Sequence, residues 1–183
     1  MLQNLTSSLF IFLLLCTPTN FMKLIAAFGE NLELGKDNRL LWHLSSDLRR
    51  FKALTIRQTV VMGSRTFQSI IDQLGKPLPH RKHLVLTRSS IATSHYSEVT
   101  YINNVSQITE YAVAENTWVI GGGEIYKLLF PLVNELYLTC VHESFPQADT
   151  WFPAWNHDDF NCVKEEPNYE ENYTYFEYIR IRN

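Results

Sequence analysis

The stretch Thr117-Trp118-Val119-Ile120-Gly121-Gly122-Gly123-Glu124-Ile125-Tyr126 joins three patterns without a gap. Residues 117–120 form an apolar run that predicts a buried strand, and residues 124–130 predict a helix that Pro131 ends. The glycines between them let a backbone approach a ligand closely, and a helix start favours phosphate. The turn matches neither GxGxxG nor GxxxxGK, so taken alone it fits a purely structural turn equally well.

A second strand, glycine and helix follow the same plan earlier in the chain. Residues 58–62 are apolar and β-branched, Gly63 follows them, and residues 64–74 predict a helix that Gly75 closes. Parallel strands place such turns at one edge of a sheet. Two of them therefore suggest a dinucleotide lying across the carboxyl ends of the strands.

Two arginines lie at the same predicted edge. Arg65 follows the second glycine turn, and Thr87-Arg88 ends a third strand predicted over residues 82–87. Arginine suits a 2′-phosphate, which would favour NADPH over NADH. For either arginine alone, a solvated surface position explains the residue equally well.

Asp47 is a carboxylate where an apolar residue is expected. At helical spacing Leu44, Leu48, Phe51 and Leu54 form one apolar stripe, and Asp47 projects into it. A buried carboxylate without a partner is unfavourable, so protein or ligand must supply one. Arg50, three residues on, is the ordinary salt-bridge alternative.

The remaining pattern completes an α/β fold. Strands are predicted over residues 22–28, 98–102 and 135–143, a helix over residues 105–114, and an antiparallel hairpin in the tail around residues 167–172. We expect a single-domain, mostly parallel twisted sheet with a C-terminal antiparallel hairpin, flanked by helices. Residues 29–43 form a long connector, which in an ordered domain is often a functional lid.

Composition limits the partners. The chain of 183 residues has a net charge of −3, so no overall basic excess attracts nucleic acid. Its three cysteines lie in no CxxC pattern and its histidines show no metal spacing, so we predict reduced thiols and no metal.

Pro77 and Pro79 fix a turn, and Arg81 after it offers a planar fork suited to a carboxylate, although an ordinary basic turn has the same composition.

Residues 1–21 differ from the rest. They contain no Lys, Arg, Asp or Glu, and residues 9–16 are continuously apolar. The run is too short to span a bilayer, and it lacks the basic region and cleavage site of a signal peptide. A weak export signal or anchor, an organelle leader, and an extension upstream of a functional start at Met22 remain open, and we favour the last. The prediction is an extension over residues 1–21 and a catalytic domain over residues 22–183.

Together the motifs resemble the dihydrofolate reductase family, most closely its short bacterial kind. They occur in the family's order from Met22 to about Arg182: Ile25-Ala26-Ala27, Leu40-Leu41-Trp42, Asp47-Leu48-x-x-Phe51-Lys52, Met62-Gly63-x-x-Thr66, Pro77-Leu78-Pro79-x-Arg81, Ile120-Gly121-Gly122-Gly123-x-x-Tyr126, Leu136-Tyr137-Leu138-Thr139 and Asp149-Thr150-x-Phe152-Pro153. The resemblance implies NADPH-dependent reduction of dihydrofolate to tetrahydrofolate, which supplies one-carbon metabolism, by a cytoplasmic monomer that antifolates inhibit.

The resemblance also implies roles for particular residues. Asp47 would bind the amino-pyrimidine edge of the pterin, with Thr139 hydrogen-bonded to it and Trp42 holding an ordered water, as the catalytic group. The substrate would contact Ile25, Ala27, Leu48, Phe51, Ile70, Leu78, Arg81, Ile120 and Tyr126, with Arg81 gripping the α-carboxylate of the glutamate tail. The cofactor would contact Ala27, Leu34, Gly35, Gly63, Ser64, Arg65, Thr66, Thr87, Arg88, Ile120, Gly121, Gly122, Gly123, Glu124 and Ile125.

Four positions depart from the family pattern. Leu41 and Ser45 stand where prolines are usual, Ser64 where Arg or Lys is usual, and Glu124 where some members have Arg. The last two weaken expected phosphate contacts. A pyrimidine reductase of riboflavin synthesis and a non-catalytic binder of NADPH or folate are the alternatives, although Asp47 and Trp42 do not fit the pyrimidine reductase pattern.

Overall fold

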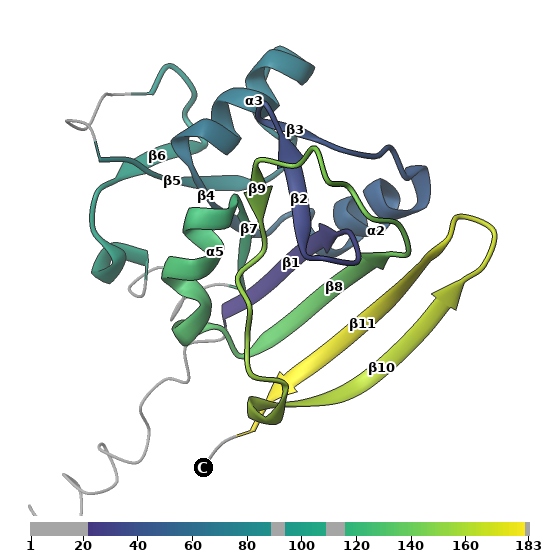
Figure 1. Ribbon diagram of the computed structural model, residues 1–183. Helices are drawn as coiled ribbons and strands as arrows, with labels where there is room; N and C mark the ends of the chain where they lie inside the picture. Colours follow the sequence, from purple (N-terminus) through teal and green to yellow (C-terminus); the bar gives the residue numbers. More distant parts are fainter. Residues whose placement is uncertain (1–21, 89–93, 109–115, 182–183) are drawn as a thin grey trace, which may run out of the picture.

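The computed structural model describes residues 22–88, 94–108 and 116–181, and its centre is an eight-stranded sheet (Figure 1). Its strand order is β10-β11-β8-β1-β7-β4-β5-β6. The strands are β1 (Met22–Phe28), β4 (Thr59–Gly63), β5 (Lys82–Leu86), β6 (Val99–Ile102), β7 (Thr117–Gly121), β8 (Glu135–Val141), β10 (Phe160–Asn168) and β11 (Tyr173–Arg180).

The predicted α/β class is confirmed by the pairing. All pairs from β8 through β1, β7, β4 and β5 to β6 are parallel. The hairpin β10–β11 joins β8 in antiparallel register, with Tyr175 opposite Thr139. The sheet is therefore mostly parallel with an antiparallel edge.

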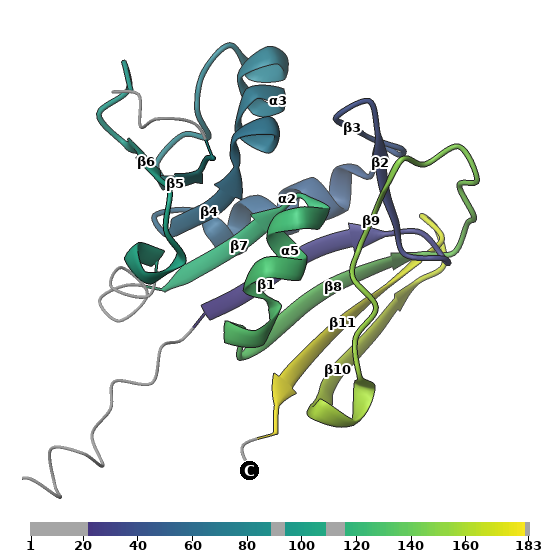
Figure 2. The same cartoon turned by 60° about the vertical axis from the view of Figure 1, so that its left-hand side comes forward.

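Helices cover both faces of the sheet (Figure 2). The helices α2 (Ser45–Thr55) and α3 (Ser64–Leu74) pack on one face, against Ile25, Val60, Met62, Val85 and Trp118. The core on the opposite face includes Leu24, Val61, Val119 and Leu136. On that face lie the helix α5 (Gly123–Leu129), the 3-10 turns η1 (Phe130–Leu132) and η2 (His157–Asp159), and the segment around Phe152. Two apolar layers thus hold the strands rigid, so that their carboxyl ends are fixed in place.

The connector over residues 29–43 is more ordered than a simple loop. It contains β2 (Glu33–Lys36) and β3 (Arg39–Leu40), which form a second sheet with β9 (Thr150–Trp151). Asp37 and Asn38 both have positive φ, the geometry of a tight two-residue hairpin turn. The connector in which we expected a lid therefore forms a small three-stranded sheet with β9, called the lid sheet below.

Element boundaries differ from the sequence predictions by a few residues. The helix after the triple glycine starts at Gly123, and its last residue is Leu129, before the 3-10 turn that contains Pro131. Residues 105–108 are helical, while the remainder of the helix predicted to residue 114 and all of residues 1–21 lie outside the described residues. Within the described ranges, no helix has the length and apolar character needed to cross a bilayer.

Candidate active site

One large cavity opens where β1, β7, β4 and β5 end. Its volume is about 2040 Å³, and the lid sheet, α2, α3 and the start of α5 surround it. All predicted site residues except Thr139 and Gly121 line it: Ile25, Ala27, Leu34, Gly35, Trp42, Asp47, Leu48, Phe51, Gly63, Ser64, Arg65, Thr66, Ile70, Leu78, Arg81, Thr87, Arg88, Ile120, Gly122, Gly123, Glu124, Ile125 and Tyr126. The structure therefore brings together residues that are far apart in the sequence.

Asp47 lies in the first turn of α2, at the wall of this cavity. Thr139 of β8, fully buried behind it, donates a 2.6 Å hydrogen bond to Asp47 Oδ1. Desolvation raises the pKa of Asp47, opposed by the Thr139 hydrogen bond and the charge of Arg50. The carboxylate is thus held in position, and it faces a space large enough for a ligand.

Arg50 does not neutralise Asp47 by direct pairing. Its Nη2 lies 3.0 Å from Glu177 Oε1, and its guanidinium lies 4.3 Å from the ring centroid of Tyr175. The salt-bridge alternative for Asp47 is therefore wrong. Among the described side chains, only Thr139 makes a hydrogen bond to the Asp47 carboxylate.

The stripe around Asp47 is less buried than its spacing suggests. Of the residues of α2, only Thr55 is buried, and Leu48 is 43% exposed. Phe51 and Leu48 line the cavity, while Leu54 packs on the sheet. The apolar face of α2 is therefore divided between the protein core and the cavity, which gives the cavity an apolar wall beside the carboxylate. The helix starts at Ser45 with Leu44 as N-cap and no side-chain cap.

Trp42 carries a buried polar atom without a protein partner. Its indole Nε1 has no hydrogen-bond acceptor among the described residues, and its ring lies 5.0 Å from that of Phe145. A buried N–H is rarely left unsatisfied, so this one is available to a water molecule or a ligand in the cavity.

Arg81 lines the cavity just before β5, and hydrogen bonds hold its guanidinium in place. The guanidinium is buried, and it donates from Nε to Thr55 Oγ1 at 2.9 Å and from Nη1 to the Pro79 carbonyl at 2.8 Å. Thr55 in turn donates to the Phe51 carbonyl at 2.6 Å. No carboxylate pairs with Arg81 in the described part of the chain, and burial lowers its pKa. An anionic ligand group would supply that partner.

The two glycine turns lie side by side where β4 and β7 end. Gly121 has φ of +107° and forms a cis peptide with Gly122. A Cβ on Gly123 would lie 2.7 Å from the Trp151 carbonyl, and one on Gly63 would lie 3.0 Å from Ile125. Helix α3 begins after Gly63 without a side-chain cap, so its first N–H groups remain available to a phosphate.

The predicted phosphate-binding arginines are both at this edge. Arg65 lines the cavity from α3, and Arg88 lies beyond the end of β5. Arg88 Nη2 is 3.5 Å from Glu124 Oε2, with both side chains largely exposed. The cationic edge is therefore partly occupied by an acidic residue of the same chain.

A hydrogen bond between Tyr126 and Ile25 joins α5 to β1 at the wall of the cavity. The buried Tyr126 hydroxyl donates a 2.8 Å hydrogen bond to the Ile25 carbonyl, and burial raises its pKa, with a further contribution from Asp47. A Cβ on Gly121 would lie 3.0 Å from the Tyr126 ring. This packing fixes the glycine turn relative to β1.

Comparison with known proteins identifies the family. A model of the dihydrofolate reductase family matches residues 21–182. The chain belongs to the dihydrofolate reductase family.

Individual dihydrofolate reductases match over most of the chain. The enzyme of Bacillus subtilis (strain 168) is 34% identical over 155 residues, which cover 84% of this chain and 88% of the relative. A type 3 dihydrofolate reductase of Salmonella typhimurium is 39% identical over 134 residues, 73% of this chain and 79% of the relative. The structure of dihydrofolate reductase from Enterococcus faecalis, complexed with NADP(H) and RAB-propyl, matches with a TM-score of 0.78 and 32% identity over 90% of this chain and 98% of that one.

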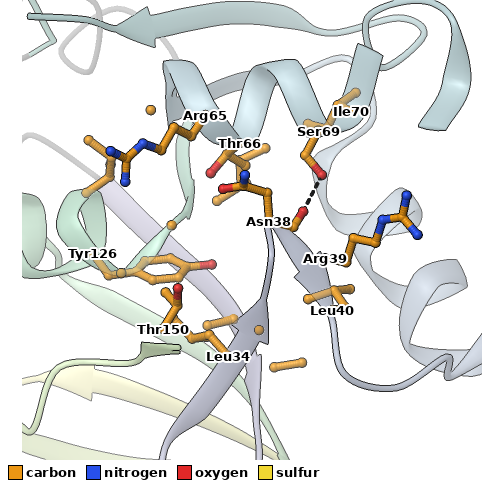
Figure 3. A pocket seen from close by; sticks show the side chains of 18 of the residues that line it. Leu34, Asn38, Arg39, Leu40, Arg65, Thr66, Ser69, Ile70, Tyr126 and Thr150 are labelled. Atoms are coloured by element: carbon orange, nitrogen blue, oxygen red, sulfur yellow. Dashed lines mark hydrogen bonds between the residues drawn. The ribbon is translucent and has the colours of Figure 1, made fainter. Parts of the chain in front are cut away.

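The dihydrofolate reductase pattern left some lining residues unassigned. Asn38, Arg39 and Ser69 line the cavity, and Ser69 Oγ of α3 donates a 2.7 Å hydrogen bond to the Asn38 carbonyl (Figure 3). Figure 3 shows the β2–β3 turn facing α3 across this contact. The only sequence signal was the Asp37-Asn38 pair, which is typical of a tight hairpin turn but says nothing of where the turn lies.

Proposed function

We propose that this chain catalyses the NADPH-dependent reduction of 7,8-dihydrofolate to 5,6,7,8-tetrahydrofolate in the cavity described above, and so supplies one-carbon units for thymidylate, purine and amino-acid synthesis. The observation that carries the proposal is the environment of Asp47. The carboxylate is partly desolvated, its position is fixed by Thr139 at 2.6 Å, and no cation of the described chain is hydrogen-bonded to it. A ligand with two adjacent N–H donors, such as the amino-pyrimidine edge of a pterin, satisfies it.

In this proposal the substrate extends through the cavity from Asp47 to Arg81. With the pterin at Asp47, its ring lies near Ile25, Ala27, Ile120 and Tyr126, and the aminobenzoyl part lies against Leu48, Phe51, Ile70 and Leu78. Arg81, fixed by Thr55 and Pro79, then receives the α-carboxylate of the glutamate tail. An acid at one end and a guanidinium at the other set the orientation.

NADPH binds in the part of the cavity that the two glycine turns form. The glycines of the two turns leave room for a ligand against the backbone, and the uncapped start of α3 with Thr66 supplies phosphate contacts. Arg65, Arg88 and Thr87 would bind the 2′-phosphate, while Leu34, Gly35, Ser64, Glu124 and Ile125 would complete the binding site. When bound, NADPH supplies the hydride.

Asp47 and Trp42 promote protonation of the substrate. Asp47 binds the pyrimidine edge rather than the ring nitrogen that is protonated, so it acts through its charge, which raises the proton affinity of the bound pterin. Trp42, with its free indole N–H, holds a water molecule that delivers the proton, and the β2–β3 lid controls the entry of that water.

We propose that residues 22–183 form the catalytic domain, with residues 1–21 outside it, and that the domain acts as a cytoplasmic monomer. The exposed edge strand β10 carries Lys164, Glu165, Glu166 and Pro167, residues that oppose pairing with a second sheet. Within the described residues Cys140 and Cys162 form no disulfide, and a reducing compartment would keep such thiols reduced.

The direct test is the loss of NADPH absorbance near 340 nm on addition of dihydrofolate. We expect a decay that requires both compounds and that Asp47→Asn removes while NADPH binding persists. NADPH binding without decay in the unmodified protein would favour a non-catalytic binder. Decay with an aminopyrimidine ribitol phosphate instead of dihydrofolate would favour the riboflavin pathway.

A further inference from the structure

The β10–β11 turn contacts the first turn of the helix that carries Asp47. Ser46, adjacent to Asp47, donates a hydrogen bond to Glu171 Oε2, and its Oγ lies 2.8 Å from the Tyr173 hydroxyl. Asn168 completes the cluster: its Nδ2 donates to the Tyr173 hydroxyl at 2.7 Å, and its Oδ1 accepts from the Glu171 backbone N–H at 3.0 Å. A turn more than a hundred residues away in sequence is thus fixed to the catalytic helix.

This contact lies at the end of α2 that carries positive charge. Helix α2 has Leu44 at its N-cap and no side-chain cap, so nothing in its own sequence complements the first turn except Asp47 itself. The Glu171 carboxylate accepts a hydrogen bond from Ser46 in that turn, and its negative charge acts on Asp47, the residue after Ser46. Tyr173 is buried, so the cluster rests on a rigid base.

Several groups face Asp47 from the surrounding elements. Within α2, Arg50 favours the charged form of Asp47, and Thr139 of β8 does the same by hydrogen bonding. Tyr126 of α5 and Tyr175 of β11 are phenols whose pKa values are raised, so both are uncharged. The charge of Glu171 acts on Asp47 in the opposite direction to that of Arg50, because it contributes to raising the pKa of Asp47.

We propose that Glu171, held by Ser46, is a positioning residue of the reductase that fixes the first turn of α2 and sets the pH range over which Asp47 supports the reaction. The proposal rests on the proposed function of Asp47. The β10–β11 turn is then a structural part of the active site, although it lines no part of the cavity. Arg50 and Glu171 act on Asp47 in opposite directions.

The test is the pH profile of kcat/KM for dihydrofolate in Glu171→Gln. Removing a negative charge near Asp47 favours the ionised form of Asp47, so we expect the midpoint of the Asp47-dependent transition to fall by about half a pH unit. Glu170→Gln is the matched control. It removes the same charge from the adjacent residue of the turn, whose side chain is exposed, and we expect it to leave the midpoint in place.

Ser46→Ala separates the charge from the contact. This variant keeps the Glu171 carboxylate but removes the hydroxyl that holds it near α2. We therefore expect the midpoint to fall, as in Glu171→Gln, but by less. The variant also tests the proposal if Glu171→Gln does not fold. Unchanged midpoints in Ser46→Ala and Glu171→Gln, or equal shifts in Glu170→Gln and Glu171→Gln, would overturn the proposal even if melting temperatures fall. Absence of reductase activity in the unmodified protein would instead contradict the proposed function.

Discussion

Thr139 donates a 2.6 Å hydrogen bond to Asp47, so a buried hydroxyl of β8 orients a carboxylate of α2 across the wall of the active site. Thr139 also lies between Ala27 of β1 and Tyr175 of β11 in the register of the sheet. The position of the carboxylate is therefore set by a strand that is paired on both sides within the sheet.

Replacing Asp47 with Asn should nearly abolish turnover at neutral pH while the fold survives. The amide keeps the size of the side chain but loses the charge that polarises the substrate, and we expect kcat/KM to fall by roughly two to three orders of magnitude. Steady-state kinetics and a thermal melt measure the two effects. An active Asp47→Asn variant would contradict the assigned role.

Replacing Thr139 with Val removes the hydrogen bond at nearly constant volume. That bond favours the ionised carboxylate, so its loss should raise the pKa of Asp47 further and move the pH midpoint of kcat/KM upward. The direction is opposite to that expected for Glu171→Gln. Measured under the same conditions, shifts of the same sign in the two variants would refute this account of the carboxylate.

Replacing Arg81 with Leu should weaken substrate binding more than it weakens chemistry. A charge-assisted pairing is worth about 2–3 kcal/mol, which predicts a rise in KM of roughly a hundredfold. A pterin substrate without the glutamate tail is the control, because it should be reduced equally well by both proteins. Thr55→Val, which loses the 2.9 Å bond that holds Arg81, should give a smaller rise in KM in the same assay.

The preference for NADPH should increase when Glu124 is replaced with Gln. Glu124 is the acidic partner of Arg88 at the edge proposed for the 2′-phosphate, so it competes with that phosphate for the arginine. We expect the ratio of kcat/KM values for NADPH and NADH to rise about threefold to tenfold at low salt and less at high salt, because both side chains are exposed. A ratio that does not change with the substitution would place the phosphate elsewhere.

The main sheet could be predicted from the sequence because each strand and turn is marked by neighbouring residues. Apolar runs such as residues 117–120, followed directly by glycines, predict buried strands and turns wherever they lie in a chain. Asp47 could be singled out because a charge inside an apolar stripe is visible in a window of eleven residues. The family motifs then placed it beside Thr139, which no local pattern relates to it.

Contacts between distant segments were not predictable in this way. Nothing around Ser46 indicates that Glu171 and Tyr173 contact it, since such a contact depends on how the hairpin curves over α2. The lid is similar. Its turn residues were visible, but the pairing of Gly35 with Thr150 follows only from the folded chain.

Glu33 is the buried acid that the sequence did not reveal, and it predicts how stability depends on pH. The residue is 3% exposed, and its carboxylate accepts hydrogen bonds from the Asn31 backbone N–H at 2.7 Å and the Phe145 backbone N–H at 2.9 Å. These bonds outweigh desolvation and lower its pKa from 4.5 to about 2. Glu33 thus joins the start of the lid to the segment after β8.

A carboxylate with a lowered folded pKa stabilises the protein above its unfolded pKa, and that contribution is lost as pH falls from 4.5 toward 2. Glu33→Gln should therefore be less stable than the unmodified protein at pH 7, by about 2 kcal/mol, the value of hydrogen bonds to a charged group. The difference should shrink through that window. Glu30→Gln, an exposed acid in the same loop, should show no such dependence in denaturant melts at each pH. A difference that persists at pH 2 would mean that Gln disrupts the packing, and that the hydrogen-bonded charge of Glu33 is not what stabilises this corner of the lid.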